Sequence, residues 1–340
     1  MMRLALAIAI LFVPAASTAA PGDEVYSHPG RLLDAGDGAK LNLVCLGTGS
    51  PTVVFDSGWS DWAPAWAVVQ PRIASFSRAC SYDRAGSGFS EPGPMPRTTE
   101  RIATELHTAL RNGGIAGPYV LVGSAFGGDH VRAFADLFPG DVAGLVLVDA
   151  DSSDVDTPEN RKSDDDSNVS YVPIFRQCRD AIASGNITYG LPPPPGRPQR
   201  MCAQAFFRGL PESQWSPELN ARLLDIAQHK LSMWDADASE MEQVPADEVW
   251  LQQHRRALGN KPVRILTSGN HAVGHLDRPP DPTIEHLKYE YDRAVAQSHW
   301  LDLSTDSKQI FVKGSSEYIQ FDQPDAVVDA VREVVELNKR

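Results

Sequence analysis

The chain has 340 residues, of which 42% are hydrophobic and 22% are charged. This is enough apolar material for a sizeable core, so intrinsic disorder is not expected. The formal net charge of -13, with no basic run, argues against nucleic acid and anionic membrane surfaces as partners.

The first twenty residues have the pattern of a secretory signal peptide. A charged start, Met1-Met2-Arg3, precedes an apolar run over 4–13, and small residues continue to Ala20. The run is too short to span a bilayer comfortably. We therefore expect residues 1–20 to be a signal peptide, and the mature protein to be secreted or periplasmic without membrane insertion. A buried N-terminal helix is the alternative.

Four cysteines, an even number, fit export, because disulfides persist outside the cytoplasm. They are Cys45, Cys80, Cys178 and Cys202, and their spacing alone does not choose between the three possible pairings. None belongs to a C-x-x-C motif or a Cys/His cluster. We therefore expect no metal and no cofactor.

Short apolar segments followed by glycine-bearing turns predict seven strands, at 40–46, 52–56, 79–82, 119–123, 142–148, 262–267 and 309–312. Helical spacing of apolar residues predicts helices over 98–112, 129–138 and 324–337. This alternation predicts a mostly parallel α/β sheet with helices on both faces. Functional groups in such a sheet gather at the carboxyl ends of the strands.

The alternation stops over residues 151–261. An acidic stretch runs from Asp149 to Asp166, a proline run covers 192–195, and helical patterns lie near 217–225 and 247–256. We interpret 151–261 as an inserted helical cap, the acidic stretch as a solvated linker, and 21–150 with 262–340 as the core. A calcium loop is the alternative for these carboxylates, although their spacing lacks the glycine and terminal glutamate of an EF-hand.

One strand, turn and helix unit carries the strongest chemical signal. The apolar segment Tyr119 to Gly123 precedes the turn Gly123-Ser124-Ala125-Phe126-Gly127, and a helix follows. The turn resembles the nucleophile elbow G-x-S-x-G of the α/β-hydrolase superfamily, in which the apex serine attacks the substrate. In this chain the apex residue is Ala125.

Further strings at 53–58, 82–90, 142–149 and 318–324 also resemble a secreted branch of that superfamily, and they occur in the same order. The resemblance covers the mature chain except the cap, and it implies an α/β-hydrolase fold. It also implies that the strands bearing Cys45 and Cys80 are neighbours. A Cys45–Cys80 disulfide is therefore expected, with a second, Cys178–Cys202, inside the cap.

The resemblance further implies a nucleophile, a histidine base, an orienting acid and two backbone N–H donors for an oxyanion. The donors would be Trp59 and Phe126. The acid position is Asp149, and the other usual location falls near Asn270, His271 and Asp277. The histidine position lies in Gly314-Ser315-Ser316-Glu317-Tyr318 and is occupied by Glu317.

Because Ala125 and Glu317 replace the expected serine and histidine, we expect a fold of the carboxylic-ester-hydrolase type without serine-hydrolase activity. It would bind a small apolar or ester-like ligand under the cap. A partner-binding role for the cap surface is a further hypothesis, and no particular residue marks it.

Two enzymatic alternatives remain. Glu317 and Asp149 could act as a carboxylate pair, with one pKa raised for general acid–base chemistry. Hydrolysis could also use a relocated nucleophile, Ser124, with His271 or His275 as the base. His130, on the elbow helix, is interpreted as a packed helix residue.

Overall fold

The computed structural model describes residues 22–191, 200–202, 215–269 and 284–339. Its main strands are β1 Arg31–Gly36, β2 Ala39–Leu46, β3 Thr52–Asp56, β4 Ala79–Tyr82, β5 Tyr119–Ser124, β6 Val142–Val148, β9 Val263–Ser268 and β10 Ser307–Val312. They form one eight-stranded sheet in the order β1-β2-β4-β3-β5-β6-β9-β10. The six strands from β4 to β10 in that order run parallel, and β1 and β2 are antiparallel. The mostly parallel sheet predicted from the sequence is confirmed.

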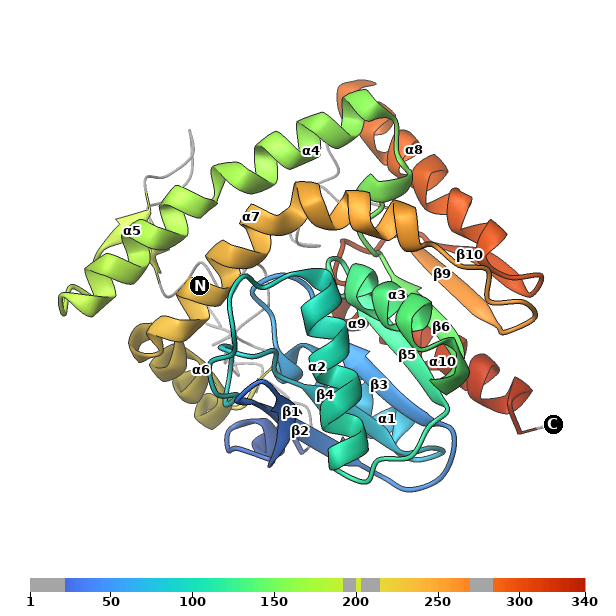
Figure 1. Cartoon of the computed structure of the whole chain (residues 1–340), viewed down its shortest axis with the longest axis horizontal. Helices are drawn as coiled ribbons and strands as arrows, with labels where there is room; N and C mark the ends of the chain where they lie inside the picture. Colours follow the sequence, from blue (N-terminus) through green and yellow to red (C-terminus); the bar gives the residue numbers. More distant parts are fainter. Residues whose placement is uncertain (1–21, 192–199, 203–214, 270–283, 340) are drawn as a thin grey trace, which may run out of the picture.

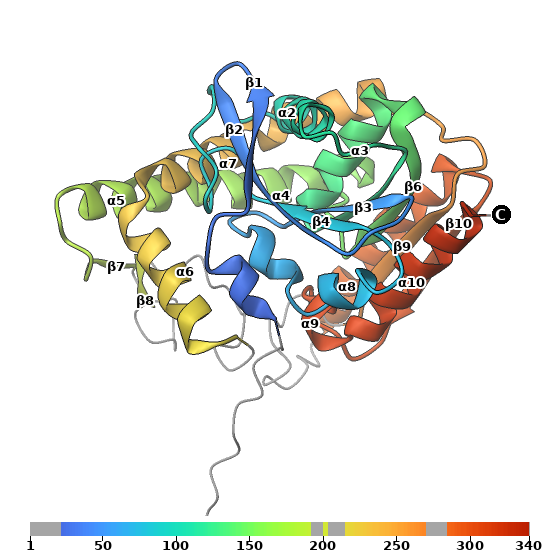
Figure 2. The same ribbon diagram turned by 90° about the horizontal axis from the view of Figure 1, so that it is seen from below.

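Helices cover both faces of the sheet. Helices α2 (Thr99–Asn112) and α3 (Gly127–Leu137) lie on one face, and α1 (Gln70–Ile73) and α10 (Pro324–Leu337) pack on the other; Figure 2 shows α2 and α3 across the sheet from α10. Side chains alternate along each strand, so Leu121 packs toward α2 and α3 while Val120 and Val122 pack toward α10. The central strands are thus buried on both faces, as their continuous apolar runs indicate.

In its described residues, the cap region supplies four α-helices between β6 and β9. They are α4 Pro158–Ser170, α5 Val172–Ala183, α6 Pro217–His229 and α7 Leu231–His254, with a two-stranded ribbon, β7 Gly190–Leu191 and β8 Arg200–Met201. Figure 1 shows α7 running between the α4–α5 pair and the core helices α2 and α3. Helix α8 (Ile284–Ser298) follows β9 and leads to β10.

Two sequence interpretations of the cap were wrong. The acidic stretch is not linker over 158–170 but helix α4, whose first turn is closed by Thr157, since the Thr157 Oγ1 accepts the Asn160 N–H at 3.2 Å. Helix α7 begins at Leu231 and passes through Pro245, whereas the prediction began after this proline. Burial of apolar residues on both sides of Pro245, such as Met241 and Leu251, offsets the lost backbone hydrogen bond.

Strand β1 was also missed, because it is an edge strand. Half of its residues are exposed, so it lacks the apolar run that marks the central strands. The start of α2 follows the prediction, since the Thr98 side chain accepts the Arg101 N–H at 3.2 Å.

Two disulfides are present, in the pairings that the resemblance implied. Cys45 and Cys80 are opposite residues of β2 and β4, and Cys178 of α5 is joined to Cys202. None of the helices in the described ranges is long and apolar enough to cross a membrane.

Candidate functional site

The elbow has the geometry of a strained turn between a strand and a helix. Ala125 lies between β5 and α3 with φ 45°, a left-handed conformation that alanine adopts only at a cost. Hydrogen bonds hold it there: its N–H donates to the Val148 carbonyl at 3.3 Å, and its carbonyl accepts the N–H groups of Gly128 and Asp151. The apex backbone is therefore fixed although its side chain is a methyl group.

Two glycines let the chain fold tightly at this point. A Cβ on Gly123 would lie 2.3 Å from the Gly127 carbonyl oxygen, and one on Gly127 would lie 2.3 Å from the Asp56 carbonyl oxygen. Neither position can hold a larger residue without moving backbone. The strand, elbow and helix thus require the glycines that mark the motif.

A second turn, Gly58–Asp61 after β3, faces the elbow. The Asp61 N–H donates to the Gly58 carbonyl at 3.1 Å, and Ser60 has φ 64°. Helix α7 fixes this turn from the cap side. The Trp59 indole N–H donates to the Asp237 carbonyl at 3.0 Å, and the Ser60 hydroxyl donates to the Asp237 carboxylate at 2.7 Å.

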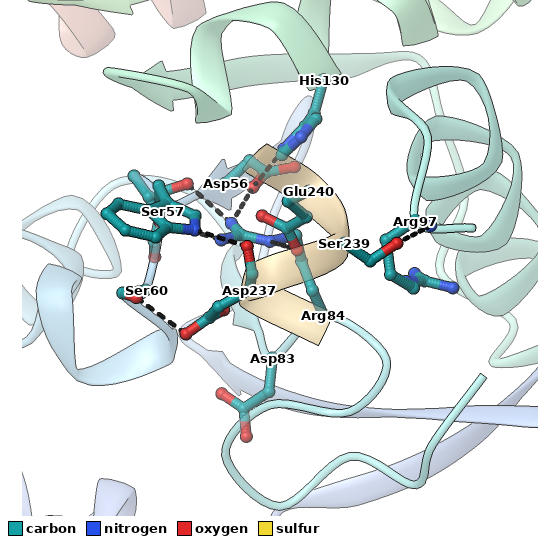
Figure 3. A network of polar contacts seen from close by, with 12 residues as sticks. Asp56, Ser57, Ser60, Asp83, Arg84, Arg97, His130, Asp237, Ser239 and Glu240 are labelled. Carbon is teal, nitrogen blue, oxygen red and sulfur yellow. Dashed lines mark hydrogen bonds and ion pairs between the residues drawn. The ribbon is translucent and has the colours of Figure 1, made fainter. Parts of the chain in front are cut away.

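A buried arginine, Arg84, also holds this turn (Figure 3). Arg84, 2% exposed, donates to the Asp56 carboxylate at 3.1 Å and to the carbonyls of Ser57 and Gly58 at 2.8 and 2.9 Å. Its Nε donates to the Glu240 carboxylate at 3.0 Å. Arg84 is thus a positioning residue that ties the backbone of the turn to both core and cap.

Asp56 is the centre of this network. Burial acts to raise its pKa, but His130, Arg84 and Tyr82 outweigh burial and lower the pKa below its ordinary value. His130 Nδ1 lies 3.3 Å from the carboxylate, and the Tyr82 hydroxyl donates to it. His130 is therefore a buried member of the network, in keeping with its interpretation as a packed residue.

A cavity of about 610 Å³ opens above the elbow. It is lined by Ala125, Phe126, Trp59, Asp149 and Glu317, the five residues assigned to the site from the sequence. Its other described lining residues come mainly from the turn at Gly58, the cap helix α4 and helix α8. The carboxyl ends of β3, β5 and β6 and the segment after β10 therefore meet at one place, as a parallel sheet requires.

Asp149 has partners that the sequence did not indicate. It follows β6 with φ 46° and is 1% exposed. Its carboxylate accepts the Ser268 N–H at 2.9 Å and the Ser268 hydroxyl at 2.7 Å, and it forms an ion pair with Arg293 of α8. These partners suit an ionised carboxylate held in one orientation.

Glu317 lies in the segment between β10 and the short helix α9 (Ile319–Asp322), where it is partly buried. The Ser316 N–H and hydroxyl donate to Asp322 at 2.8 and 2.6 Å, which fixes the turn that carries Glu317. Ser124, the alternative nucleophile, also lines the cavity. His271, His275, Asn270 and Asp277 lie outside the described residues.

The sequence reasoning missed Arg293, Lys288 and Asp292, which line the cavity from α8. No motif marked α8. Its Arg293 takes part in the site through an ion pair with Asp149, which lies 144 positions earlier in the chain. Asp61 was also missed, although it stands two residues after the singled-out Trp59. Arg84 lies inside the segment 82–90, which resembles the superfamily, but nothing in that segment indicated that Arg84 would contact Glu240.

No group of three or more histidine, cysteine or acidic side chains in the described ranges is arranged to hold a metal ion. Two carboxylates of the stretch that begins at Asp149 are instead paired with arginine side chains, Asp149 with Arg293 and Asp154 with Arg132. The geometry thus gives no support to the calcium alternative for the stretch after Asp149.

Comparison with known proteins gives matches over parts of the chain. A 2-hydroxy-6-oxo-2,4-heptadienoate hydrolase of Pseudomonas putida is 33% identical over 130 residues, which cover 37% of this chain and 46% of that protein. An uncharacterized protein of Schizosaccharomyces pombe is 29% identical over 159 residues, covering 38% of this chain and 30% of its own length. The chain thus spans less than half the length of these relatives.

Solved structures match over nearly the whole chain. Cfl2 from Burkholderia cenocepacia has a TM-score of 0.63 at 18% identity, covering 89% of this chain and 94% of its own. A thermophilic esterase from Thermogutta terrifontis has a TM-score of 0.53 at 20% identity, covering 92% and 99%. At these identities the likeness concerns the fold. The sequence model of the Alpha/beta hydrolase family matches residues 43–330, and the chain belongs to that family.

Proposed function

We propose that this protein binds a small ligand under its cap and does not hydrolyse esters by the serine mechanism. The observation that carries the proposal is Ala125 at the apex of an otherwise intact elbow. A methyl group cannot attack a carbonyl carbon, so no acyl-enzyme can form at this position. Loss of the serine or histidine in a serine hydrolase typically lowers turnover on the order of a millionfold.

The cavity supports a binding role. Its volume of about 610 Å³ suits a small organic molecule, and its wall combines aromatic side chains with polar groups. A ligand with an apolar or ester-bearing body fits the aromatic part of this wall. The two fixed turns at Gly58 and Ala125 would give such a ligand a rigid floor.

The two disulfides support function in an oxidising compartment. We propose that the protein is secreted or periplasmic.

The decisive experiment treats the purified protein with a fluorophosphonate probe and with p-nitrophenyl esters. We expect no labelling and no turnover above a heat-inactivated control. Labelling of the wild-type chain would overturn the proposal and would direct attention to Ser124.

A companion variant tests whether the scaffold is a disabled hydrolase. Ala125→Ser with Glu317→His restores the two family residues on an unchanged backbone. Measurable esterase activity would mean that only these two groups are missing. No activity is the result we expect, because Arg293 and Ser268 already occupy the Asp149 carboxylate that a histidine would need.

The second candidate is acid–base chemistry by Glu317 and Asp149, favoured by their position on one cavity. The contacts of Asp149 count against it, because an ion-paired carboxylate is a poor proton carrier. If a metabolite screen finds turnover, Glu317→Gln should abolish it under this candidate. Unchanged turnover would eliminate Glu317 from the chemistry.

A further inference from the structure

Gln320 brings an unused hydrogen-bond acceptor to the wall of the cavity. It belongs to α9, is 1% exposed and is one of the residues that line the cavity. Within the described part of the chain, no donor makes a hydrogen bond to its buried Oε1 atom. Such atoms are rare in folded proteins, because burying an acceptor without a donor costs free energy. The side-chain amide of Gln320 thus has a hydrogen bond left to make.

The hydroxyl groups that precede α9 cannot supply this bond. The Ser315 hydroxyl donates to the Ser316 carbonyl at 2.8 Å, and the Ser316 hydroxyl donates to the Asp322 carboxylate at 2.6 Å. Each hydroxyl has a single hydrogen to donate, so both are already in use. The donor for Gln320 is therefore left to a molecule that enters the cavity.

The elbow offers the opposite kind of group. Helix α3 begins there with Phe126 as its N-cap, a residue whose side chain cannot accept a capping hydrogen bond. The first N–H groups of a helix have no partner within it, and the helix dipole adds partial positive charge at this end. Ala125 and Phe126 line the same cavity as Gln320. A ligand can thus place an acceptor oxygen at the elbow.

One ligand can meet both ends of the cavity. A molecule that fills about 610 Å³ contacts the elbow as well as α9. It then needs an acceptor oxygen for the elbow and a hydrogen to donate to Gln320. A carboxamide carries both groups on one planar unit. An ester carries the carbonyl oxygen but no hydrogen, so it would leave Gln320 Oε1 buried and unpaired.

We propose that Gln320 determines the specificity of the cavity by accepting the N–H of a carboxamide ligand, whose carbonyl oxygen lies at the elbow. This inference rests on the proposed function, since it narrows the ligand class of the same cavity from ester-like molecules to amides. A site that hydrogen-bonds a donor of its ligand rejects the analogue that lacks this donor, because the buried acceptor is left unpaired. Preference for an amide over the matching ester is the expected signature.

The first test compares an amide with an ester of nearly the same shape. N-benzylacetamide and benzyl acetate differ only in the N–H that replaces the ester oxygen. We expect N-benzylacetamide to bind the intact protein about tenfold more tightly or better in calorimetric titration. Equal or tighter binding of benzyl acetate, or no binding of N-benzylacetamide, would overturn the inference.

A variant assigns the preference to Gln320. Gln320→Met keeps the length of the side chain and removes the acceptor, so it should weaken binding of the amide about tenfold and leave the ester unaffected. A purely structural role would weaken both molecules. Gln253→Met, at an exposed glutamine of α7 outside the cavity, should retain the wild-type preference. An unchanged preference in Gln320→Met would overturn the role of Gln320, and the wild-type comparison stands even if this variant does not fold.

A second variant locates binding at the elbow. Gly58→Ala adds a methyl 3.4 Å from the Ala125 methyl carbon, in ordinary van der Waals contact, and the φ of Gly58 lies outside the left-handed region. It should weaken binding of both molecules while the protein stays folded. Gly140→Ala is the matched control, because a Cβ there meets no atom within 4 Å. Full binding of both molecules by Gly58→Ala would overturn the assigned position.

The inference and the proposed function fail separately. If the amide and the ester bind equally and neither is cleaved, only the preference for an amide is wrong. Fluorophosphonate labelling, or release of benzyl alcohol or benzylamine, would instead overturn the non-hydrolytic function.

Discussion

Two of the carboxyl groups that helix α7 buries, those of Glu240 and Glu248, have different surroundings. Glu240, 6% exposed, accepts a hydrogen bond from Arg84, which also binds Asp56 and the turn at Gly58. Glu248, 3% exposed and two turns farther on, lies near Asp151 and Asp165. Its nearest cation, Arg161, is 3.7 Å away.

The consequence appears in the protonation of Glu248. Burial first, and then the charges of Asp151 and Asp165, raise its pKa to about 9, and Arg161 offsets only part of this. Near neutral pH, Glu248 is therefore mostly protonated. One end of α7 is attached to the core by permanent charges, and the other end by a contact that depends on a proton. The end with permanent charges, near Glu240, is joined through Arg84 to Gly58, which lines the candidate site.

The largest expected effect comes from removing the permanent charge. Arg84→Met leaves Asp56 and Glu240 buried without their cation, and breaking such a buried pair costs about 3–5 kcal/mol. The free energy of unfolding from denaturant titration measures it. Arg72→Met, which removes an exposed pair with Asp325, should cost about 1 kcal/mol or less and serves as the control. Similar losses in both variants would contradict the anchoring role of Arg84.

The proton-dependent end predicts a pH effect. Since the pKa of Glu248 is raised, its stabilising contribution is complete below the unfolded pKa of about 4.3 and is lost as pH rises toward 9. Between about pH 5 and 8, wild-type protein should lose roughly 2–4 kcal/mol more than Glu248→Gln, because the folded state holds a proton that the unfolded state has released. Denaturant titrations at several pH values measure the difference.

Other buried acids determine how strongly the free energy of unfolding of Glu248→Gln still depends on pH. Burial also raises the pKa of Asp136 to about 6 and that of Asp129 well above its ordinary value. The exposed variant Glu336→Gln should retain the full wild-type slope. If Glu248→Gln retains it as well, Glu248 is ionised in the folded protein and the proposed difference between the two ends of α7 is wrong.

The sequence indicated the sheet and the elbow because both depend on local patterns. Apolar runs and glycine turns marked seven of the eight main strands, and the motif around Ala125 placed a turn whose glycines are sterically required. Residues at strand ends, such as Trp59 and Asp149, could be assigned to one site because parallel strands end at a common edge.

Contacts between remote residues could not be predicted in this way. Arg84 and Glu240 are 156 positions apart, and neither side of the pair is marked by periodicity or by a motif shared with the other. The same holds for the ion pair of Asp149 with Arg293. Because of this pair, the carboxylate at the acid position already has a cationic partner. Helix α4 was missed for a different reason, since its capping residue is visible but few of its side chains are apolar.

The smallest expected effect concerns Asp237, which lies on the end of α7 that Arg84 attaches to the core. Burial, followed by the charge of Glu240, raises the pKa of Asp237 well above its ordinary value, so the fold favours the neutral form of this carboxyl. Asp237→Asn keeps its shape and the oxygen that accepts the Ser60 hydroxyl, and it should change the free energy of unfolding by less than about 1 kcal/mol.

Asp56→Asn is the matched comparison, because it is an equally conservative change at a carboxylate whose pKa is lowered. Here the charge itself is needed to balance Arg84 and His130, and we expect a loss of roughly 2–3 kcal/mol. A reversed order of the two variants would mean that Asp237, rather than Asp56, carries the negative charge that Arg84 requires. In that case the turn at Gly58 would be held mainly from the cap, and opening the cap would release it.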